Sequence, residues 1–284
     1  MVKRLSLLLL ASAVALAAAA DTVPKRIISL IPATTEMIFA MGAGDRLIAV
    51  SSFDKYPPEA LRLPKVGALL DPDTERILSM RPDLVLAYGT QTELKRSLDR
   101  AGIPFYSYEH RAMPDIMATI RAIGTRIGAM SQANALAASM EQALARVSSA
   151  VAGQRRPRTM LVFERDRSSL QNIYASGGYG FLADLLDVAG GDNIFGDIRQ
   201  QSVQASTEMI LARRPEVIIE LRYGESARNP DPSRDRRAWQ TLGAVPAVRD
   251  SRIVVLVGDQ YVVPGPRIID AARELARAIH PAPR

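Results

Sequence analysis

The sequence predicts an α/β protein of two lobes, each built on a mostly parallel sheet, that are joined by one long backbone helix. The first observation is the alanine-rich stretch of residues 131–152, in which Leu136, Met140, Leu144 and Val147 recur every three or four residues. This spacing is typical of a helix with one apolar face, and at 1.5 Å per residue the helix would span roughly 33 Å. Strand-type and helix-type segments alternate on both sides of it, and one segment of the first half recurs in the second.

Signals at the ends of the long helix set the expected domain boundaries. Ser131 is a residue type that caps helix N-termini, and Gly153 is a type at which helices commonly end. We therefore expect an N-terminal lobe of residues 21–128, a bridging helix within residues 129–156 and a C-terminal lobe of residues 157–284. Because one helix crosses between the lobes, closure about the hinge should be small.

Residues 1–20 have the pattern of a secretory signal peptide. Lys3 and Arg4 precede an apolar run over residues 5–16, and alanines 18–20 form a small-residue cleavage site before Asp21. A membrane anchor is the alternative, but the apolar run is short for a span. No cysteine follows the run, so the sequence also argues against a lipid anchor of the bacterial type.

Composition excludes several classes of function. The chain has no cysteine, so it has no disulfide framework, thiolate nucleophile or zinc–thiolate site. Its two histidines, His110 and His280, are too few for most metal sites, and no metal site is expected. The net charge of +6 is spread without long basic runs, which argues against a nucleic-acid partner.

In the N-terminal half, short apolar runs end at turn residues such as Pro32, and helices close at glycines such as Gly42. Two prolines exclude regular structure from residues 51–58, after the second strand. The expected strands are residues 26–30, 47–50, 84–87 and 103–107. The expected helices are residues 34–41, a helix capped by Asp73, residues 92–100 and a helix that begins near Pro114.

The alternation resumes after the long helix. We expect strands at residues 159–164, 217–221 and 253–257, and helices at residues 181–188, 206–213 and 266–278. Residues 166–180 are polar and rich in glycine, and they should form a long loop. Residues 225–237 are charged and contain prolines, so we expect a solvated, mobile loop there. Trp239 should be a core anchor.

The internal repeat joins a helix to a strand in both halves. Thr74, Glu75, Ile77, Leu78, Arg81 and Pro82 match Thr207, Glu208, Ile210, Leu211, Arg214 and Pro215, and every pair is displaced by 133 residues. An acidic residue and a strand follow each copy. Two lobes of similar build on either side of one helix would leave a cleft between them.

Several stretches, in this order, resemble the helical-backbone (class III) periplasmic binding proteins of ABC importers, and the likeness covers essentially the whole mature chain. They are residues 75–78 with 81–85, residues 177–182 with 189–194, and residues 264–267. The resemblance implies a monomeric periplasmic protein that captures a metal chelate and delivers it to an inner-membrane ABC permease and its ATPase. The family carries vitamin B12, ferric siderophores and haem. It implies neither catalysis nor a cofactor beyond the ligand.

The segment Asp54-Lys55-Tyr56-Pro57-Pro58 is similar to the Asp-Tyr-Pro-Pro stretch of the B12-binding branch, in which the tyrosine lies against the corrin. Here Lys55 is inserted into the stretch. The branch also places tryptophans where this chain has the Gly67–Leu70 loop and Gln260. These departures leave a corrinoid, a ferric siderophore and haem all open as the ligand.

Candidate ligand-binding residues follow the strands, because ligands of open α/β sheets lie beyond the carboxyl ends of the strands. Tyrosine offers a flat face and a hydroxyl, whereas arginine offers a forked donor for anionic groups. The expected ligand-binding residues are Tyr56, Tyr88, Arg165, Arg167, Arg222, Tyr223 and Tyr261.

Glu75 and Glu208 are the acidic members of the internal repeat. In the first turn of a helix a carboxylate is favoured by the helix dipole, which is one explanation for both. In the family that the chain resembles, a glutamate at the matching place on each lobe docks against arginines of the permease. The resemblance therefore implies a permease-docking role for this pair.

Two other classes of function are alternatives. An exported hydrolase on an α/β scaffold would need a nucleophile and a base, but the sequence has neither a Gly-x-Ser-x-Gly elbow nor a His-Glu-x-x-His motif. An interaction protein without a small ligand could use the same scaffold. A role for His110 in ligand binding is a minor alternative.

Overall fold

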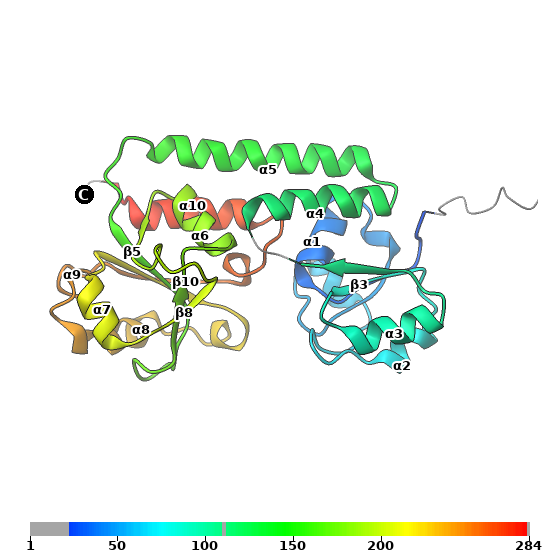
Figure 1. Ribbon diagram of the computed structural model, residues 1–284, viewed down its shortest axis with the longest axis horizontal. Coiled ribbons are helices and arrows are strands. Elements are labelled where there is room, and N and C mark those ends of the chain that lie inside the picture. The colour runs from blue at the N-terminus through cyan, green and yellow to red at the C-terminus, as the bar shows by residue number, and fades with distance from the viewer. Residues whose placement is uncertain (1–22, 110–111, 283–284) are drawn as a thin grey trace, which may run out of the picture.

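The computed structural model describes residues 23–109 and 112–282, so the predicted signal peptide and His110 lie outside the described residues. Two α/β lobes lie side by side, and α5 (Met130–Val151) runs along one side of both (Figure 1). The predicted fold class is thus confirmed. The helix begins at Met130 and Ala129 precedes it, so the prediction of Ser131 as its N-cap is wrong. No helix in the described ranges combines the length and hydropathy needed to cross a membrane.

The N-terminal lobe has a four-stranded parallel sheet in the order β2-β1-β3-β4. Its strands are β1 (Ile27–Ser29), β2 (Leu47–Val50), β3 (Leu84–Tyr88) and β4 (Phe105–Tyr108), and its helices are α1 (Pro32–Ala40), α2 (Thr74–Ser79), α3 (Thr92–Arg100) and α4 (Met113–Arg126). Strands β1 and β3 are almost wholly buried, as expected for strands covered on both faces. Every strand and helix predicted in this lobe is present.

The C-terminal lobe has a mixed sheet in the order β10-β9-β5-β6-β8, with β7 paired to β5. Strands β10, β9 and β5 are parallel, whereas β6 runs antiparallel to both β5 and β8. The strands are β5 (Arg158–Glu164), β6 (Ile173–Ser176), β7 (Asp192–Asn193), β8 (Ser202–Ala205), β9 (Val217–Arg222) and β10 (Ile253–Val257). Strand β6 lies inside the predicted loop 166–180, so that prediction is wrong for its second half.

The helices of this lobe are α6 (Phe181–Val188), α7 (Thr207–Arg213), α8 (Pro232–Ala238), α9 (Pro246–Arg249) and α10 (Ile268–Ile279). The prediction of a solvated loop over residues 225–237 is wrong, because a 3-10 turn and α8 occupy it. Asp231 caps α8, and Asp235 is fully buried against arginines of the sheet. The C-terminal helix begins at Ile268, two residues later than predicted.

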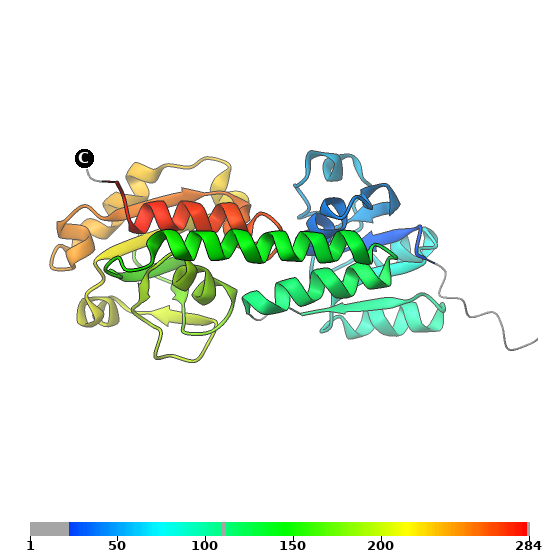
Figure 2. The same cartoon turned by 90° about the horizontal axis from the view of Figure 1, so that it is seen from above.

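Helices on one side tie the lobes together. Helix α5 crosses both lobes, with α4 beside it over the N-terminal lobe and α10 beside it over the C-terminal lobe (Figure 2). The approach of α4 to α5 is so close that a Cβ on Gly124 would lie 2.1 Å from the Cβ of Ala133. The largest hydrophobic cluster contains Met37 and Leu86 of one lobe, Met140 of α5, and Leu161 and Leu275 of the other. One hydrophobic cluster therefore runs from one lobe to the other along α5.

The internal repeat extends to individual hydrogen bonds. In the N-terminal lobe, Asp83 accepts a hydrogen bond from the backbone N–H of Arg26 at 2.9 Å, and Arg26 donates from Nη2 to the carbonyl of Met80 at 2.7 Å. In the C-terminal lobe, Glu216 accepts from the backbone N–H of Arg158 at 2.8 Å. Arg158 in turn donates from Nη2 to the carbonyl of Arg213 at 2.7 Å. The same clamp holds the end of α2 and the end of α7 to the first strand of each lobe.

Candidate ligand-binding cleft between the lobes

A cavity of about 630 Å³ lies between the lobes, within the roughly 300–1,000 Å³ typical of small-molecule sites. The start of α1, the loop after β2 and the end of β3 line it from one lobe. The ends of β5 and β9, residues 224–226 and residues 259–267 line it from the other. A larger hollow of about 990 Å³ lies at the amino ends of β3 and β4 and touches one lobe only. We place the candidate site in the cleft because α/β sheets bind ligands at their carboxyl ends.

The N-terminal wall of the cleft is largely aromatic and apolar. Phe53 and Tyr56 are 51% and 43% exposed, and Leu69 and Tyr88 line the cavity beside them. Partial burial raises the pKa of Tyr88, so its hydroxyl stays protonated at neutral pH. Tyr56 and Tyr88, both predicted from the sequence, are brought together here.

Asp54 shapes the loop that carries Phe53 and Tyr56. Its carboxylate accepts hydrogen bonds from the backbone N–H of Ser51 at 2.9 Å and from its hydroxyl at 2.5 Å. Asp54 is only 1% exposed, and its Oδ1 has no hydrogen-bond partner among the described residues. Burial raises its pKa, although the hydrogen bonds from Ser51 oppose the shift.

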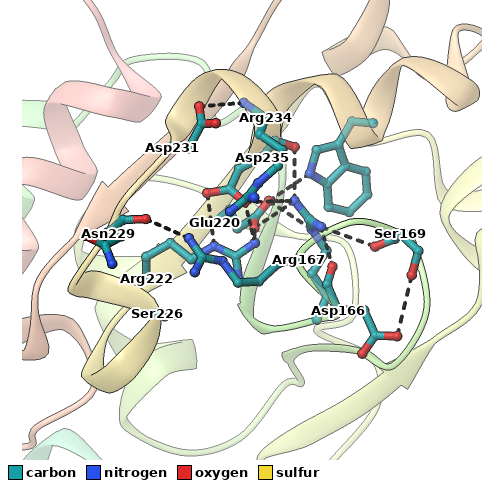
Figure 3. A network of polar contacts seen from close by, with 12 residues as sticks. Asp166, Arg167, Ser169, Glu220, Arg222, Ser226, Asn229, Asp231, Arg234 and Asp235 are labelled. Carbon is teal, nitrogen blue, oxygen red and sulfur yellow. Dashed lines mark hydrogen bonds and ion pairs between the residues drawn. The ribbon is translucent and has the colours of Figure 1, made fainter.

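Arg165 and Arg222, which were predicted to bind ligand, are held in a buried ion cluster with Glu220 and Asp235. Figure 3 shows Arg222, Glu220 and Asp235 of this cluster. Arg165 donates from Nε and Nη2 to Glu220 Oε2 at 3.1 and 3.0 Å, and Arg222 donates from Nη2 to Asp235 Oδ1 at 2.9 Å. Trp239, buried as predicted, donates from Nε1 to Glu220 at 2.8 Å.

The side chains of Arg165 and Arg222 are 0% and 3% exposed. Both residues border the cavity, but their guanidinium groups already have carboxylate partners on β9 and α8. They build the wall behind the cleft instead of presenting free charge to it.

Arg167 lies two residues after Arg165 but is not part of the buried ion cluster. It lines the cavity, and its Nη2 donates to the backbone carbonyl of Asn229 at 2.8 Å. Its Nε is buried without an acceptor, and no carboxylate among the described residues pairs with it. Of the three arginines predicted from the strand ends, Arg167 therefore has donors left for a ligand.

The two remaining predicted tyrosines are placed differently. Tyr223 lines the cavity, and partial burial raises the pKa of its hydroxyl. Tyr261 is 1% exposed and does not border the cavity. Its hydroxyl donates to Glu274 on α10, because the turn at residues 259–261 directs the ring toward that helix. The structure does not bring Tyr261 together with the other candidates.

A pair that sequence reasoning did not select joins the two walls. Arg267, just before α10, donates from Nε to Glu36 Oε2 at 3.0 Å and from Nη2 to Oε1 at 2.5 Å. The Cζ of Arg267 also lies 4.2 Å from the ring centroid of Tyr56. A second, looser pair joins Lys55 Nζ and Asp259 Oδ2 at 3.6 Å. The Pro-Gly-Pro-Arg stretch was a signal for Arg267, but nothing in the sequence marked Glu36.

Charge in the cleft is almost fully compensated. The basic residues that line it are Lys55, Arg165, Arg167, Arg222 and Arg267, and the acidic ones are Glu36, Glu164, Glu225 and Asp259. Arg165 and Arg222 pair with Glu220 and Asp235, and exposed Glu225 pairs with Arg228 outside the cavity. Among the described residues, one cation on Arg167 and one anion on Glu164 then lack an ion-pair partner.

Nothing in the described chain offers a protein-built metal centre, since no group of three or more His, Cys, Asp or Glu side chains there could hold an ion.

Glu75 and Glu208 lie outside the cleft, exposed in the first turns of α2 and α7. Both helices lie on the side of the lobes away from α5 (Figure 1). Asp73 and Ser206 cap them by accepting hydrogen bonds from the backbone N–H groups of Arg76 and Met209. The two carboxylates thus occupy equivalent places in the internal repeat.

Comparison with known proteins agrees with the fold. The family model for periplasmic binding proteins matches residues 27–259. The vitamin B12-binding protein of Pectobacterium carotovorum subsp. carotovorum (strain PC1) is 32% identical over 263 residues, which cover 92% of this chain and 90% of the relative.

Two solved structures are also similar. The vitamin B12-binding protein BtuF of Vibrio cholerae is 27% identical with a TM-score of 0.74, over 90% of this chain and 97% of that one. The heme-binding protein RhuT of Roseiflexus sp. RS-1 is 25% identical with a TM-score of 0.77, over 90% and 98%. This chain therefore belongs to the periplasmic binding protein family.

Proposed function

We propose that this protein captures a flat metal chelate of low net charge, of the corrinoid type, in the cleft between its lobes and delivers it to an ABC permease in the inner membrane. The observation that carries the proposal is the pairing of an aromatic wall with a wall whose charges are almost all compensated. The vitamin B12-binding relative, which aligns with nearly the whole chain, supports the same ligand class.

The charge balance argues against a polyanionic ferric catecholate. Such a ligand carries several negative charges, and its transfer from water into the cleft would require a surplus of cations there. Arg167 is the one basic side chain lining the cleft that lacks an ion-pair partner in the described structure, and Glu164 offsets its charge. A ligand with a neutral periphery and at most one anionic group fits this arrangement better.

The wall residues suggest how a flat chelate would lie. Tyr56, Tyr88 and Phe53 offer ring faces for the macrocycle, and Tyr223 faces them from the other lobe. Arg167, which lines the cavity and has no carboxylate partner among the described residues, would receive the single anionic group through a charge-assisted hydrogen bond. The chelated metal would keep its own ligands, so the protein needs no cofactor.

Haem is the second candidate. The similarity to RhuT favours it, and Arg167 together with Arg267 could meet its carboxylates. Recruiting Arg267 would require that it leave Glu36, with which it forms two hydrogen bonds. That cost places haem behind a corrinoid.

Delivery would use Glu75 and Glu208. Their equivalent positions on the two lobes suit a permease made of two similar halves, whose arginines would receive one glutamate each. The clamps of Arg26 and Arg158 on α2 and α7 would hold both glutamates in matching orientations. The protein would then work in the periplasm, after cleavage of residues 1–20, as a monomer.

Melting temperature with and without ligand tests the proposal. A ligand that binds only the folded protein stabilises it by about 2.7 kcal/mol at a hundredfold excess over Kd. We expect cyanocobalamin to raise the melting temperature, haemin to raise it less, and a ferric catecholate to leave it unchanged. No shift with any chelate, together with turnover of a generic ester, would contradict the proposal and favour an exported hydrolase.

A further inference from the structure

The ion pair of Glu36 and Arg267 connects the lobes across the cleft. Glu36 belongs to α1 of the N-terminal lobe, and Arg267 precedes α10 of the C-terminal lobe, 231 residues later in the chain. The two hydrogen bonds form a bidentate pair, in which the planar guanidinium lies against both carboxylate oxygens. This geometry fixes the orientation of the two partners as well as their separation.

The backbone around Arg267 lies directly against α1. A Cβ on Gly265 would lie 3.3 Å from Glu36 Oε2 and 3.6 Å from the backbone of Ala33. Pro264 and Pro266 flank this glycine and limit the conformations of the segment. Backbone atoms as well as the Arg267 side chain therefore pack the two lobes together here.

Burial makes this pair different from the other ion pair across the cleft. The Glu36 side chain is 2% exposed and that of Arg267 is 21% exposed, whereas Lys55 and Asp259 are 42% and 27% exposed. An exposed ion pair such as Lys55–Asp259 contributes little free energy to holding the two lobes together. The nearby carboxylates of Asp54 and Asp259 repel the negative charge of Glu36, whereas Arg267 stabilises that charge.

Arg267 reaches the aromatic wall at the same time. Its guanidinium lies over the ring of Tyr56, 4.2 Å from the ring centroid, within the distance of a cation–π contact. Tyr56 is otherwise carried by an exposed loop. One arginine thus joins α1, the Tyr56 loop and the start of α10.

We propose that Glu36 and Arg267 form an interlobe latch, which fixes the separation of the lobes before ligand arrives and holds the ring of Tyr56 in place. Helices α4, α5 and α10 restrain the lobes on one side, and the latch restrains them at the cleft. The cleft would then be assembled in advance, and ligand binding would cost little further ordering. The latch does not depend on which chelate is bound.

Distance measurement between two spin labels tests the latch without any ligand. The chain has no cysteine, so Arg100→Cys on α3 and Ala212→Cys on α7 give one exposed label on each lobe. With Glu36 and Arg267 intact we expect a single narrow distance distribution. Arg267→Met removes both hydrogen bonds between the lobes, so it should broaden the distribution and shift it to longer separation. Burial raises the pKa of Glu36, which favours a neutral carboxyl once its partner is gone.

Glu36→Gln leaves Arg267 without a counter-charge and is the variant more prone to misfold. The double variant Glu36→Gln with Arg267→Met removes both charges, and it should broaden the distribution as much as Arg267→Met alone. Glu141→Gln is the matched control, since it breaks a Glu–Arg pair between α4 and α5, 2.9 Å long, far from the cleft. It should leave the distribution unchanged.

Ligand affinity provides a second readout. If opening reduces the binding-competent state to about one tenth of the molecules, the apparent Kd rises about tenfold. Distributions for Arg267→Met and for the double variant that match the wild type would overturn the latch. Because this is measured in the ligand-free protein, it would leave the proposed ligand class untouched.

Discussion

Replacing Arg165 by Met separates the two roles that its position after β5 suggests. A ligand-contacting arginine would be removed at little cost to stability, whereas a member of a buried ion cluster would not. Arg165 donates to Glu220 Oε2 and to the backbone carbonyls of Asp166, Ser169 and Asp235. The Met side chain fills much of the same space but leaves Glu220 and Asp235 with Arg222 as their sole cation.

The magnitude follows from the unpaired charge. Breaking a fully buried ion pair by removal of one partner costs about 3–5 kcal/mol, and the Arg165 side chain is 0% exposed. At roughly 2–4 °C per kcal/mol for domains of 150–250 residues, the melting temperature should fall by roughly 6–20 °C. Much of the lost stability comes from the buried carboxylate that is left without its partner. The change in unfolding free energy therefore measures the cost of removing Arg165, and not the net contribution of the ion cluster to stability.

Arg167→Met is the matched control, because it makes the same change two residues away. It removes one hydrogen bond to the carbonyl of Asn229, which corresponds to about 0.5–1.5 kcal/mol or roughly 1–6 °C. Calorimetric melting and ligand titration of both variants should show lost stability for Arg165→Met and lost affinity for Arg167→Met. An Arg165→Met protein that melts like the wild type but fails to bind ligand would refute this reasoning.

Three further predictions follow from the structure. Glu75→Gln combined with Glu208→Gln should abolish transporter-dependent uptake while ligand affinity and melting temperature stay unchanged, and wild-type uptake would leave only a helix-dipole role for the pair. Gly124→Ala should cost about 1–3 kcal/mol in urea unfolding, because its Cβ would collide with Ala133, and an unchanged midpoint would show that α4 and α5 can separate freely. Burial raises the pKa of Asp54 above its ordinary value of 3.8, so the folded protein binds this proton more tightly than the unfolded chain does. The resulting gain in folding free energy is fully present below pH 3.8 and is lost as the pH rises through the raised pKa. Asp54→Asn should therefore gain melting temperature relative to the wild type as the pH rises above about 4, whereas parallel curves would argue against a raised pKa.

Local patterns predicted the parts of the fold that depend on neighbouring residues. The alanine stretch and its apolar stripe predicted α5 to within one residue at each end. The recurrence of Thr74-Glu75 as Thr207-Glu208 predicted two lobes of similar build. The hydrogen bonds of Arg26 and Arg158 show that the repeat extends to single side-chain contacts. Strand β6 was missed because it is short and lies within a run rich in polar residues and glycine.

The candidate site was harder to predict, because pairing between distant residues decides it. Arg165 and Arg167 follow the same strand, and no local signal tells them apart. The partners that separate them, Glu220 and Asp235, come 55 and 70 residues later. Glu36 was missed for the same reason, since its partner Arg267 lies near the other end of the chain.

Calorimetric titration with cyanocobalamin at low and high salt tests the central claim. The claim is that the aromatic wall of the cleft binds a flat chelate, and that the charges lining the cleft are compensated within the protein. We expect one site with a Kd below about 1 μM, or about 8 kcal/mol of binding free energy. We also expect little change in Kd when salt shortens the screening length from about 10 Å to about 3 Å. Tight, strongly salt-dependent binding of a ferric catecholate with no binding of cyanocobalamin would contradict the account.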